Sequence, residues 1–131
     1  MRLLLDTHIW LWSLLRPERL SRRVAKEIQS ADNELWLSPI SVWELGILCD
    51  KGRVMLTQDV ESWVDAVLRA VPMHEAPLTA EIALATRGIR LPHRDPADRF
   101  LAATAKVLGL TLVTADQRLL ACQGITVLAN R

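Results

Sequence analysis

The chain begins with three leucines that end in an acid, Leu3-Leu4-Leu5-Asp6. A strand that is apolar at every position is buried on both faces, which is typical of the centre of a parallel sheet. Asp6 must then lie where the strand leaves the core, and in an open α/β sheet this carboxyl edge is where ligands bind. The alternative is that Asp6 only caps the following helix, because Asp is a favoured N-cap residue. The run therefore predicts a buried parallel strand and leaves two roles open for its acid.

The rest of the sequence alternates short apolar runs with helical patterns. Helices are expected over residues 7–15, 21–31, 41–50, 57–70, 79–88 and 95–108, with a short one after Asp116. Strands or extended segments are expected over residues 35–37, 73–77, 111–114 and 125–128. Strands that alternate with helices form a parallel sheet with right-handed crossovers. We therefore expect an α/β fold of three α/β/α layers with a central parallel sheet.

Capping residues set the expected helix starts. Ser21, Ser41 and Thr57 are each interpreted as N-caps. Ser41 is followed three residues later by Glu44, which is the capping-box arrangement. Pro96 in the first turn after Asp95 marks the start of the best-defined helix.

The composition limits the kinds of partner. The 131 residues carry a net charge of +1, so any nucleic-acid contact is expected to be local rather than spread over the surface. Cys49 and Cys122 lack the spacing of a metal site and fit buried thiols in a reducing compartment. No apolar run reaches the roughly 18 residues needed to cross a bilayer, and the N-terminus does not resemble a signal peptide. We expect a cytoplasmic protein of one domain, residues 1–131, without membrane contact.

Four acids are predicted to meet at the same edge of the sheet. Asp6 and Asp116 follow strands, whereas Glu44 and Asp98 lie in the first turns of helices that begin over that edge. Four carboxylates with no basic residue among them repel one another, so a cation is expected between them. Ligation by oxygen alone favours Mg²⁺ or Mn²⁺ over zinc. The structural alternative is that each of these acids only caps a helix or turn.

Other polar residues near these acids have two interpretations each. Thr7, Ser41 and Thr114 are expected either to orient a carboxylate or a metal-bound water, or to act as cap and strand-end hydroxyls. His8 and His93 either transfer a proton or touch phosphate, or they stabilise a neighbour by a hydrogen bond. The local cations for an RNA backbone would be Lys51, Arg53, Arg90, Arg94, Arg99 and Arg118, although most of them are expected simply to be solvated.

Four motifs, spread in order over the whole chain, give a resemblance to a known family. They are Leu4-Leu5-Asp6-Thr7-His8, Ser41-Val42-Trp43-Glu44-Leu45, His93-Arg94-Asp95-Pro96-Ala97-Asp98-Arg99 with Ala102-Ala103, and Leu112-Val113-Thr114-Ala115-Asp116. The sequence resembles the PIN-domain family, in particular the VapC-like toxins of type II toxin–antitoxin systems. The resemblance implies a metal-dependent endoribonuclease that uses Mg²⁺ or Mn²⁺, forms a homodimer and is inhibited by a cognate antitoxin. It places Asp6, Glu44, Asp98 and Asp116 on the family's acidic quartet.

The same resemblance leaves the role of Asp95 open. Asp95 and Arg99 belong to an Asp-Pro-x-Asp-Arg variant of the motif. Asp95 stands three residues before Asp98 and could join the site, but we expect it to be a helix cap first.

Three other functions fit the sequence less well than a nuclease does. A haloacid-dehalogenase-like phosphatase would need a second Asp two residues after Asp6, where His8 stands. A receiver domain would need a lysine near the end of the chain, and none follows Lys106. A PIN-like module that binds a protein partner without catalysis is the alternative from another class, and the complete acidic quartet argues against it.

The tryptophans of the first helix predict a binding surface. Trp10 and Trp12 cannot face one side of a helix, so one of them is expected near the surface. With Leu11, Leu14 and Leu15 they supply more apolar surface than one core-facing stripe requires. We expect part of this surface to form a groove for an amphipathic segment of an antitoxin.

Overall fold

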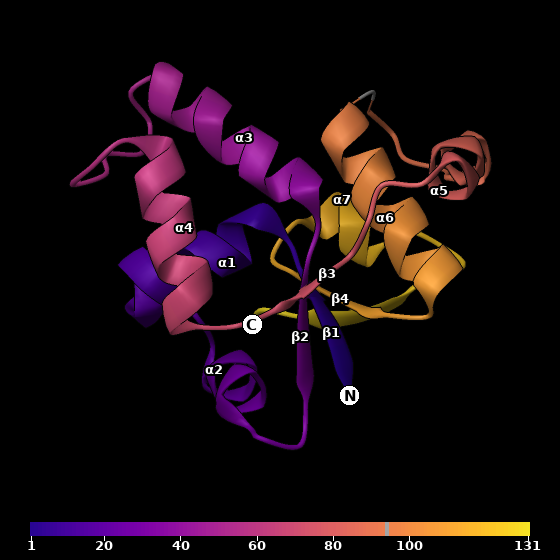
Figure 1. The fold of residues 1–131 in the computed structure, drawn as a ribbon. Helices are drawn as coiled ribbons and strands as arrows, with labels where there is room; N and C mark the ends of the chain where they lie inside the picture. Colours follow the sequence, from indigo (N-terminus) through magenta and orange to yellow (C-terminus); the bar gives the residue numbers. More distant parts are fainter. Residues whose placement is uncertain (94) are drawn as a thin grey trace.

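The computed structural model describes residues 1–93 and 95–131, and in this part of the chain five strands form one sheet (Figure 1). Arg94, one of the predicted cations, lies outside the described residues. The strands are β1 (Arg2–Leu5), β2 (Glu34–Leu37), β3 (His74–Glu75), β4 (Thr111–Thr114) and β5 (Thr126–Ala129). Their order is β3-β2-β1-β4-β5, and every neighbouring pair is parallel. The predicted parallel sheet is confirmed.

Strand β1 is the centre of the sheet because its three leucines are apolar on both faces. It pairs with β2 on one side and β4 on the other, with Leu4 opposite Trp36 and Leu112. Leu3 and Leu5 pack into the core on one face, and Leu4 packs into the core on the other. All three leucines are almost completely buried. The sequence of β1 therefore determines where both apolar layers meet the sheet.

Helices cover both faces of the sheet (Figure 1). On the side of Leu3 and Leu5 lie α1 (Thr7–Leu15), α2 (Arg22–Gln29), α3 (Pro39–Asp50) and α4 (Val60–Ala70), with a 3-10 turn η1 at Pro17–Arg19. On the side of Leu4 lie α5 (Ala80–Ala85), α6 (Pro96–Leu108) and α7 (Gln117–Leu120), with a 3-10 turn η2 at Thr86–Gly88. The fold is the expected three-layer α/β/α arrangement. Among the described residues, no helix combines the length and apolar character needed to cross a membrane.

Two of the predicted helix caps are wrong. Helix α3 begins at Pro39 and is capped by Ser38, whose hydroxyl accepts a hydrogen bond from the Ile40 amide at 3.1 Å. Proline lacks an amide hydrogen and has a suitable φ, so it starts the helix two residues before Ser41. Helix α4 is capped by Asp59 rather than Thr57, through the Ser62 amide at 2.7 Å.

Other local predictions are confirmed. Ser21 caps α2 through the Val24 amide at 3.2 Å, although that helix ends at Gln29 rather than Ala31. Asp95 caps α6, and Gly109 ends it in the left-handed conformation at φ 65°. Trp10 is buried at 2% exposure, whereas Trp12 is only partly buried.

The central position of β1 predicts a large effect of truncating one of its leucines. Leu4→Ala should lower the free energy of unfolding by about 2–5 kcal/mol, because it removes a buried side chain and leaves a cavity. Leu84→Ala is the matched control, since Leu84 is 69% exposed. Denaturant titration of both variants measures the difference, and equal losses would contradict the central role of β1.

Candidate metal centre

The structure brings all four predicted acids to one cavity of about 360 Å³ at the carboxyl edge of the sheet. Asp6 lies between β1 and α1, and Asp116 lies between β4 and α7. Asp98 is in the first turn of α6, and Glu44 projects from the second turn of α3. The cavity is lined by Asp6, His8, Trp12, Glu44, Asp95, Asp98, Ala115, Asp116 and Arg118.

Asp6 is a buried carboxylate held by hydrogen bonds at both oxygens. Its Oδ1 accepts from the Thr7 amide at 2.7 Å, and its Oδ2 accepts from the Thr114 hydroxyl at 2.7 Å. Burial raises the pKa of Asp6 to about 6, the bond from Thr114 opposes this rise, and the charge of Asp98 adds to it. The capping role and the site role that the sequence left open are therefore both compatible with the geometry of Asp6.

Glu44 is held by the residue that follows Asp6. The Thr7 hydroxyl donates to Glu44 Oε1 and also lies 2.9 Å from the Ser41 hydroxyl. Burial raises the pKa of Glu44 to about 7, and the charge of Asp6 contributes to the rise. Because α3 begins at Pro39, Glu44 is not the capping-box acid that the sequence predicted. Thr7 therefore donates hydrogen bonds to both Asp6 and Glu44, the two acids whose pKa values rise most clearly.

Asp98 pairs with a histidine. His93 Nε2 lies 2.7 Å from Asp98 Oδ2, and both side chains are largely buried. Burial raises the pKa of Asp98, while the hydrogen bond from His93 opposes the rise. His93 Nδ1 is buried and has no hydrogen-bond partner within the described part of the chain.

Asp116 differs from the other three acids because an arginine compensates its charge. It caps α7 through the Arg118 amide at 2.8 Å, and the Arg118 guanidinium lies 3.0 and 3.2 Å from its two oxygens. This contact lowers the pKa of Asp116. The prediction that no basic residue lies among the acids is therefore wrong at Arg118, and at His93 whenever that ring is protonated.

The residues fit a divalent cation, although the sequence did not predict every donor. His93, Asp95 and Asp98 offer ligand atoms that all lie within 4.8 Å of one another. Asp95 also caps α6 through the Ala97 amide at 3.0 Å, so the predicted cap is confirmed beside the acids. Carboxylate oxygens suit Mg²⁺ and Mn²⁺, and an added imidazole nitrogen suits Mn²⁺ better than Mg²⁺. The sequence indicated His93 as a residue for proton transfer, phosphate contact or a hydrogen bond but not as a metal ligand, because its place beside Asp98 depends on the loop before α6.

The chain is thus an α/β/α protein that gathers carboxylates at the carboxyl edge of the central strands of a parallel sheet. The family model named PIN domain matches residues 3–123. The chain therefore belongs to the PIN domain family, which confirms the resemblance seen in the motifs.

Individual relatives agree with this assignment. The chain is 37% identical over 119 residues to Ribonuclease VapC22 of Mycobacterium tuberculosis (strain ATCC 25618 / H37Rv), covering 88% of each chain. Its fold is similar to a chain of VapBC2 from Rickettsia felis, solved with a DNA fragment from their promoter, at a TM-score of 0.71, 16% identity and 98% coverage of both chains. It is also similar to a chain of DNA-bound VapBC from Salmonella typhimurium, at a TM-score of 0.66, 18% identity and coverage of 100% and 99%.

The raised pKa values predict that stability without metal falls as the pH rises. Between about pH 4 and pH 7 the unfolded chain loses protons that the folded protein keeps on Asp6 and Glu44. For Asp6 the loss approaches about 3 kcal/mol, at ~1.4 kcal/mol per pKa unit. Mn²⁺ should restore stability at high pH, because it binds the folded state. Thermal melting in EDTA and in Mn²⁺ across this range measures both effects.

Asp6→Asn is the matched variant for this experiment, because it removes the charge but keeps the shape. Its melting temperature in EDTA should hold or rise at pH 8, while calorimetry should show weaker Mn²⁺ binding. Unchanged Mn²⁺ affinity in Asp6→Asn would exclude this carboxylate from the metal centre.

Proposed function

We propose that the protein is a metal-dependent endoribonuclease and the toxin of a type II toxin–antitoxin pair. The observation that carries the proposal is the convergence of Asp6, Glu44, Asp98 and Asp116 on one cavity, where three of these acids have raised pKa values. Such acids stay close together at neutral pH only if protons or a cation offset their charge, and a cation does so while leaving the carboxylates ionised. The identity of 37% to a protein named as a ribonuclease supports RNA as the substrate.

The proposed ligands are Asp6, Asp98 and Asp116, with Glu44 beside them. A bound Mg²⁺ or Mn²⁺ would activate water and neutralise the charge that develops on the phosphodiester. Thr114 fixes one oxygen of Asp6, and Thr7 fixes one oxygen of Glu44, so both carboxylates are oriented before substrate binds.

Arg118 and His93 limit the repulsion within the centre. Arg118 neutralises Asp116, and His93 donates to Asp98 when Nε2 carries a proton. The nitrogen donor of His93 also favours Mn²⁺ over Mg²⁺ as the cation in the site. The competing function, a catalytically silent binding module, has no need for carboxylates held in this way.

Substitution of the acids should separate catalysis from stability. Alanine at any of Asp6, Asp98, Asp116 or Glu44 should reduce RNA cleavage by roughly 100-fold or more, because interactions with the developing charge are lost. Asp95→Ala should instead cost about 1 kcal/mol of stability as a lost N-cap and reduce activity only in part. Cleavage in Mn²⁺ and thermal melting are measured on the same preparations.

Asp65→Ala is the control, because Asp65 is an exposed acid on α4 whose partner is Arg69. An Asp98→Ala protein that melts normally and cleaves at the parent rate would refute the nuclease assignment. An inactive Asp95→Ala protein with normal melting would place Asp95 among the metal ligands.

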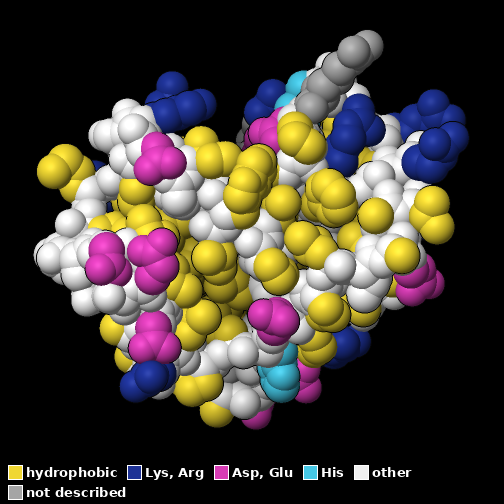
Figure 2. Space-filling model, turned by 45° about the horizontal axis from the view of Figure 1, so that its top comes forward, with side chains coloured by type: hydrophobic (Ala, Val, Ile, Leu, Met, Phe, Trp, Pro, Cys, Tyr) yellow, Lys and Arg dark blue, Asp and Glu magenta, His cyan; other side chains and the backbone are white. Residues whose placement is uncertain are grey.

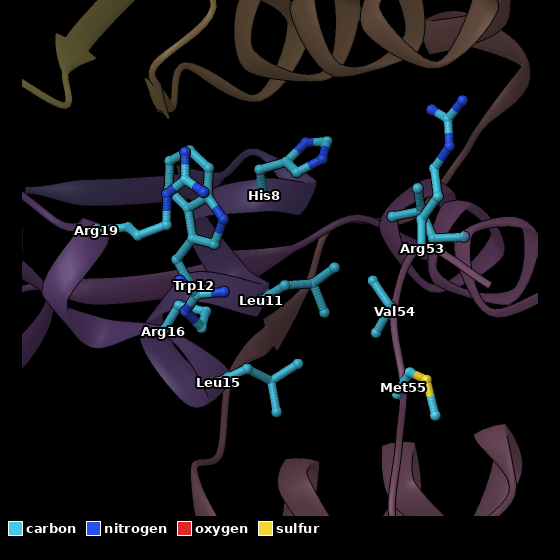
Figure 3. A pocket seen from close by; sticks show the side chains of 10 residues that line it. His8, Leu11, Trp12, Leu15, Arg16, Arg19, Arg53, Val54 and Met55 are labelled. Carbon is cyan, nitrogen blue, oxygen red and sulfur yellow. The ribbon is translucent and has the colours of Figure 1, made fainter. Parts of the chain in front are cut away.

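A groove beside the acidic cavity is the proposed site for the antitoxin (Figure 3). It has a volume of about 660 Å³ and is lined by His8, Leu11, Trp12, Leu15, Arg16, Arg19, Leu48, Arg53, Val54 and Met55. Figure 3 shows Val54 and Met55 facing Leu11 and Leu15 across the groove. An apolar floor with arginines at its margin suits an amphipathic segment that carries acidic residues. The similar structures named VapBC and the toxin–antitoxin complex from Klebsiella pneumoniae support a protein partner of this kind.

The sequence left open which of the two tryptophans lies near the surface and contributes to this groove. Trp10 is buried against Trp63, with ring centroids 5.8 Å apart, and does not line the groove. Trp12 does line it, and the Arg19 guanidinium lies 4.6 Å from its ring centroid. The homodimer and the cytoplasmic location stay predictions.

Substituting the two tryptophans should therefore give different results. Trp12→Ala should weaken antitoxin binding by about 2 kcal/mol, the size of effect seen for central aromatic residues of interfaces. Trp10→Ala should instead lower stability by about 3–5 kcal/mol, because it empties a core site. Trp43→Ala is the control, since Trp43 is 53% exposed outside the groove. A titration in which Trp12→Ala binds antitoxin as the parent does would place the interface elsewhere.

A further inference from the structure

A separate cavity lies beside the loop that connects η2 to α6. It has a volume of about 480 Å³ and is lined by Arg87, Ile89, Arg90, Leu91, Pro92 and Arg99. Three of these side chains are guanidinium groups, and no carboxylate lines the cavity. Lys and Arg side chains gather at the upper right of the face shown in Figure 2, the region of η2 and this loop. A chain with a net charge of only +1 therefore concentrates positive charge at this place.

The charges of Arg87 and Arg90 are not compensated within the protein. Both side chains are exposed, and neither forms a salt bridge or a side-chain hydrogen bond to any other residue in the described ranges. By contrast, Arg16, Arg69 and Arg118 each pair with an acid two to four residues away. Ile89, which stands between the two free arginines, is buried and anchors the segment. Two anchored cations without partners fit an anionic ligand from outside the chain.

Arg99 connects this cavity to the acidic centre. Its guanidinium donates to the Ile89 carbonyl at 2.9 Å and to the His93 carbonyl at 3.1 Å. It therefore holds the segment at Ile89 and at His93, and it still contributes its charge to the cavity. The preceding residue, Asp98, faces the acidic cavity and binds His93 from that side. One turn of α6 thus holds a carboxylate in one cavity and a guanidinium in the next.

We propose that this arginine cavity, lined by Arg87, Arg90 and Arg99, binds backbone phosphates of the RNA strand next to the phosphate at the acidic centre. The inference rests on the proposed nuclease function. A centre of four acids repels a polyanion, so an RNA strand needs positive charge close by to hold it there. Guanidinium groups are well suited to phosphate, because they donate in a bidentate geometry and stay charged. An acidic protein segment would also match the positive charge of the cavity. Only a strand with repeated phosphates can also place one phosphate at the acidic centre and the next at the arginine cavity, which meet at Asp98 and Arg99 on one turn of α6.

Salt dependence of RNA binding tests the proposal. Binding of a fluorescein-labelled single-stranded RNA is measured by anisotropy in EDTA, over a range of KCl concentrations, for the parent, Arg87→Ala, Arg90→Ala and the double variant. Each lost phosphate contact should reduce the slope of log K against log salt by about 0.7. Arg69→Ala is the matched control, since Arg69 is exposed and pairs with Asp65 on α4. Arg99 is left intact because its guanidinium holds the loop.

The outcomes separate this proposal from the proposed function. Reduced slopes in Arg87→Ala and Arg90→Ala, with the parent slope in Arg69→Ala and normal melting throughout, would support the phosphate site. Unchanged slopes in Arg87→Ala and Arg90→Ala would overturn it. If these variants bind RNA as the parent does but bind the antitoxin more weakly, the proposal is also overturned, and the surface belongs to the protein partner. Cleavage in Mn²⁺ is measured in parallel. A parent protein that binds RNA through these arginines but does not cleave it would refute the nuclease and leave the phosphate site standing.

Discussion

The site depends on a carboxylate placed directly after three buried leucines of the central strand. Leu3, Leu4 and Leu5 are almost completely buried, so Asp6 is the first polar side chain after the core and is itself buried. Burial disfavours its charged form, and only hydrogen bonds at both oxygens make the position tolerable. The partners come from two places, the amide of α1 and the hydroxyl at the end of β4. The pairing of β1 with β4 and the start of α1 therefore determine the geometry of the acid together.

The charges of the four acids are balanced in two different ways. Asp116 is neutralised by Arg118, and its pKa is lowered, so it is charged over the whole neutral range. Asp6 and Glu44 receive only hydroxyl and amide donors, and their pKa values rise to about 6 and 7. A hydroxyl orients a carboxylate without cancelling its charge. The uncompensated charge is thus concentrated at Asp6 and Glu44, and it can be offset by protons or by a metal ion.

Features that depend on a few neighbouring residues could be predicted from the sequence. The buried strand follows from three adjacent leucines, and the start of α6 follows from Asp95 and Pro96. The start of α3 was misjudged because Ser38 and Ser41 are both acceptable caps, and Glu44 made the later one look like a capping box. Pro39 decides the choice, because it occupies the first turn more easily than any later position. A single proline in the first turn therefore indicates the start of a helix better than the spacing of Ser41 and Glu44 does.

Contacts of the site that depend on loop geometry were not predictable in this way. Arg118 stands two residues after Asp116, and its pairing is a short-range contact that the sequence could have indicated. His93 meets Asp98 from the loop before α6, where Arg99 donates to the carbonyls of Ile89 and His93, so this contact requires the folded loop. Strand ends, helix starts and the family resemblance indicated the four acids from the sequence, whereas the contact between His93 and Asp98 required the folded structure.

The acidic cavity and the apolar groove share a wall, which limits how they can be used. His8 and Trp12 line both the acidic cavity and the apolar groove, because they project from the first turns of α1, directly after Asp6. A segment that fills the groove along Trp12 therefore ends beside the carboxylates. RNA that is held at the same carboxylates must lie against the same two side chains. The proposed partner and the proposed substrate would therefore compete for His8 and Trp12, because α1 places both side chains within six residues of Asp6.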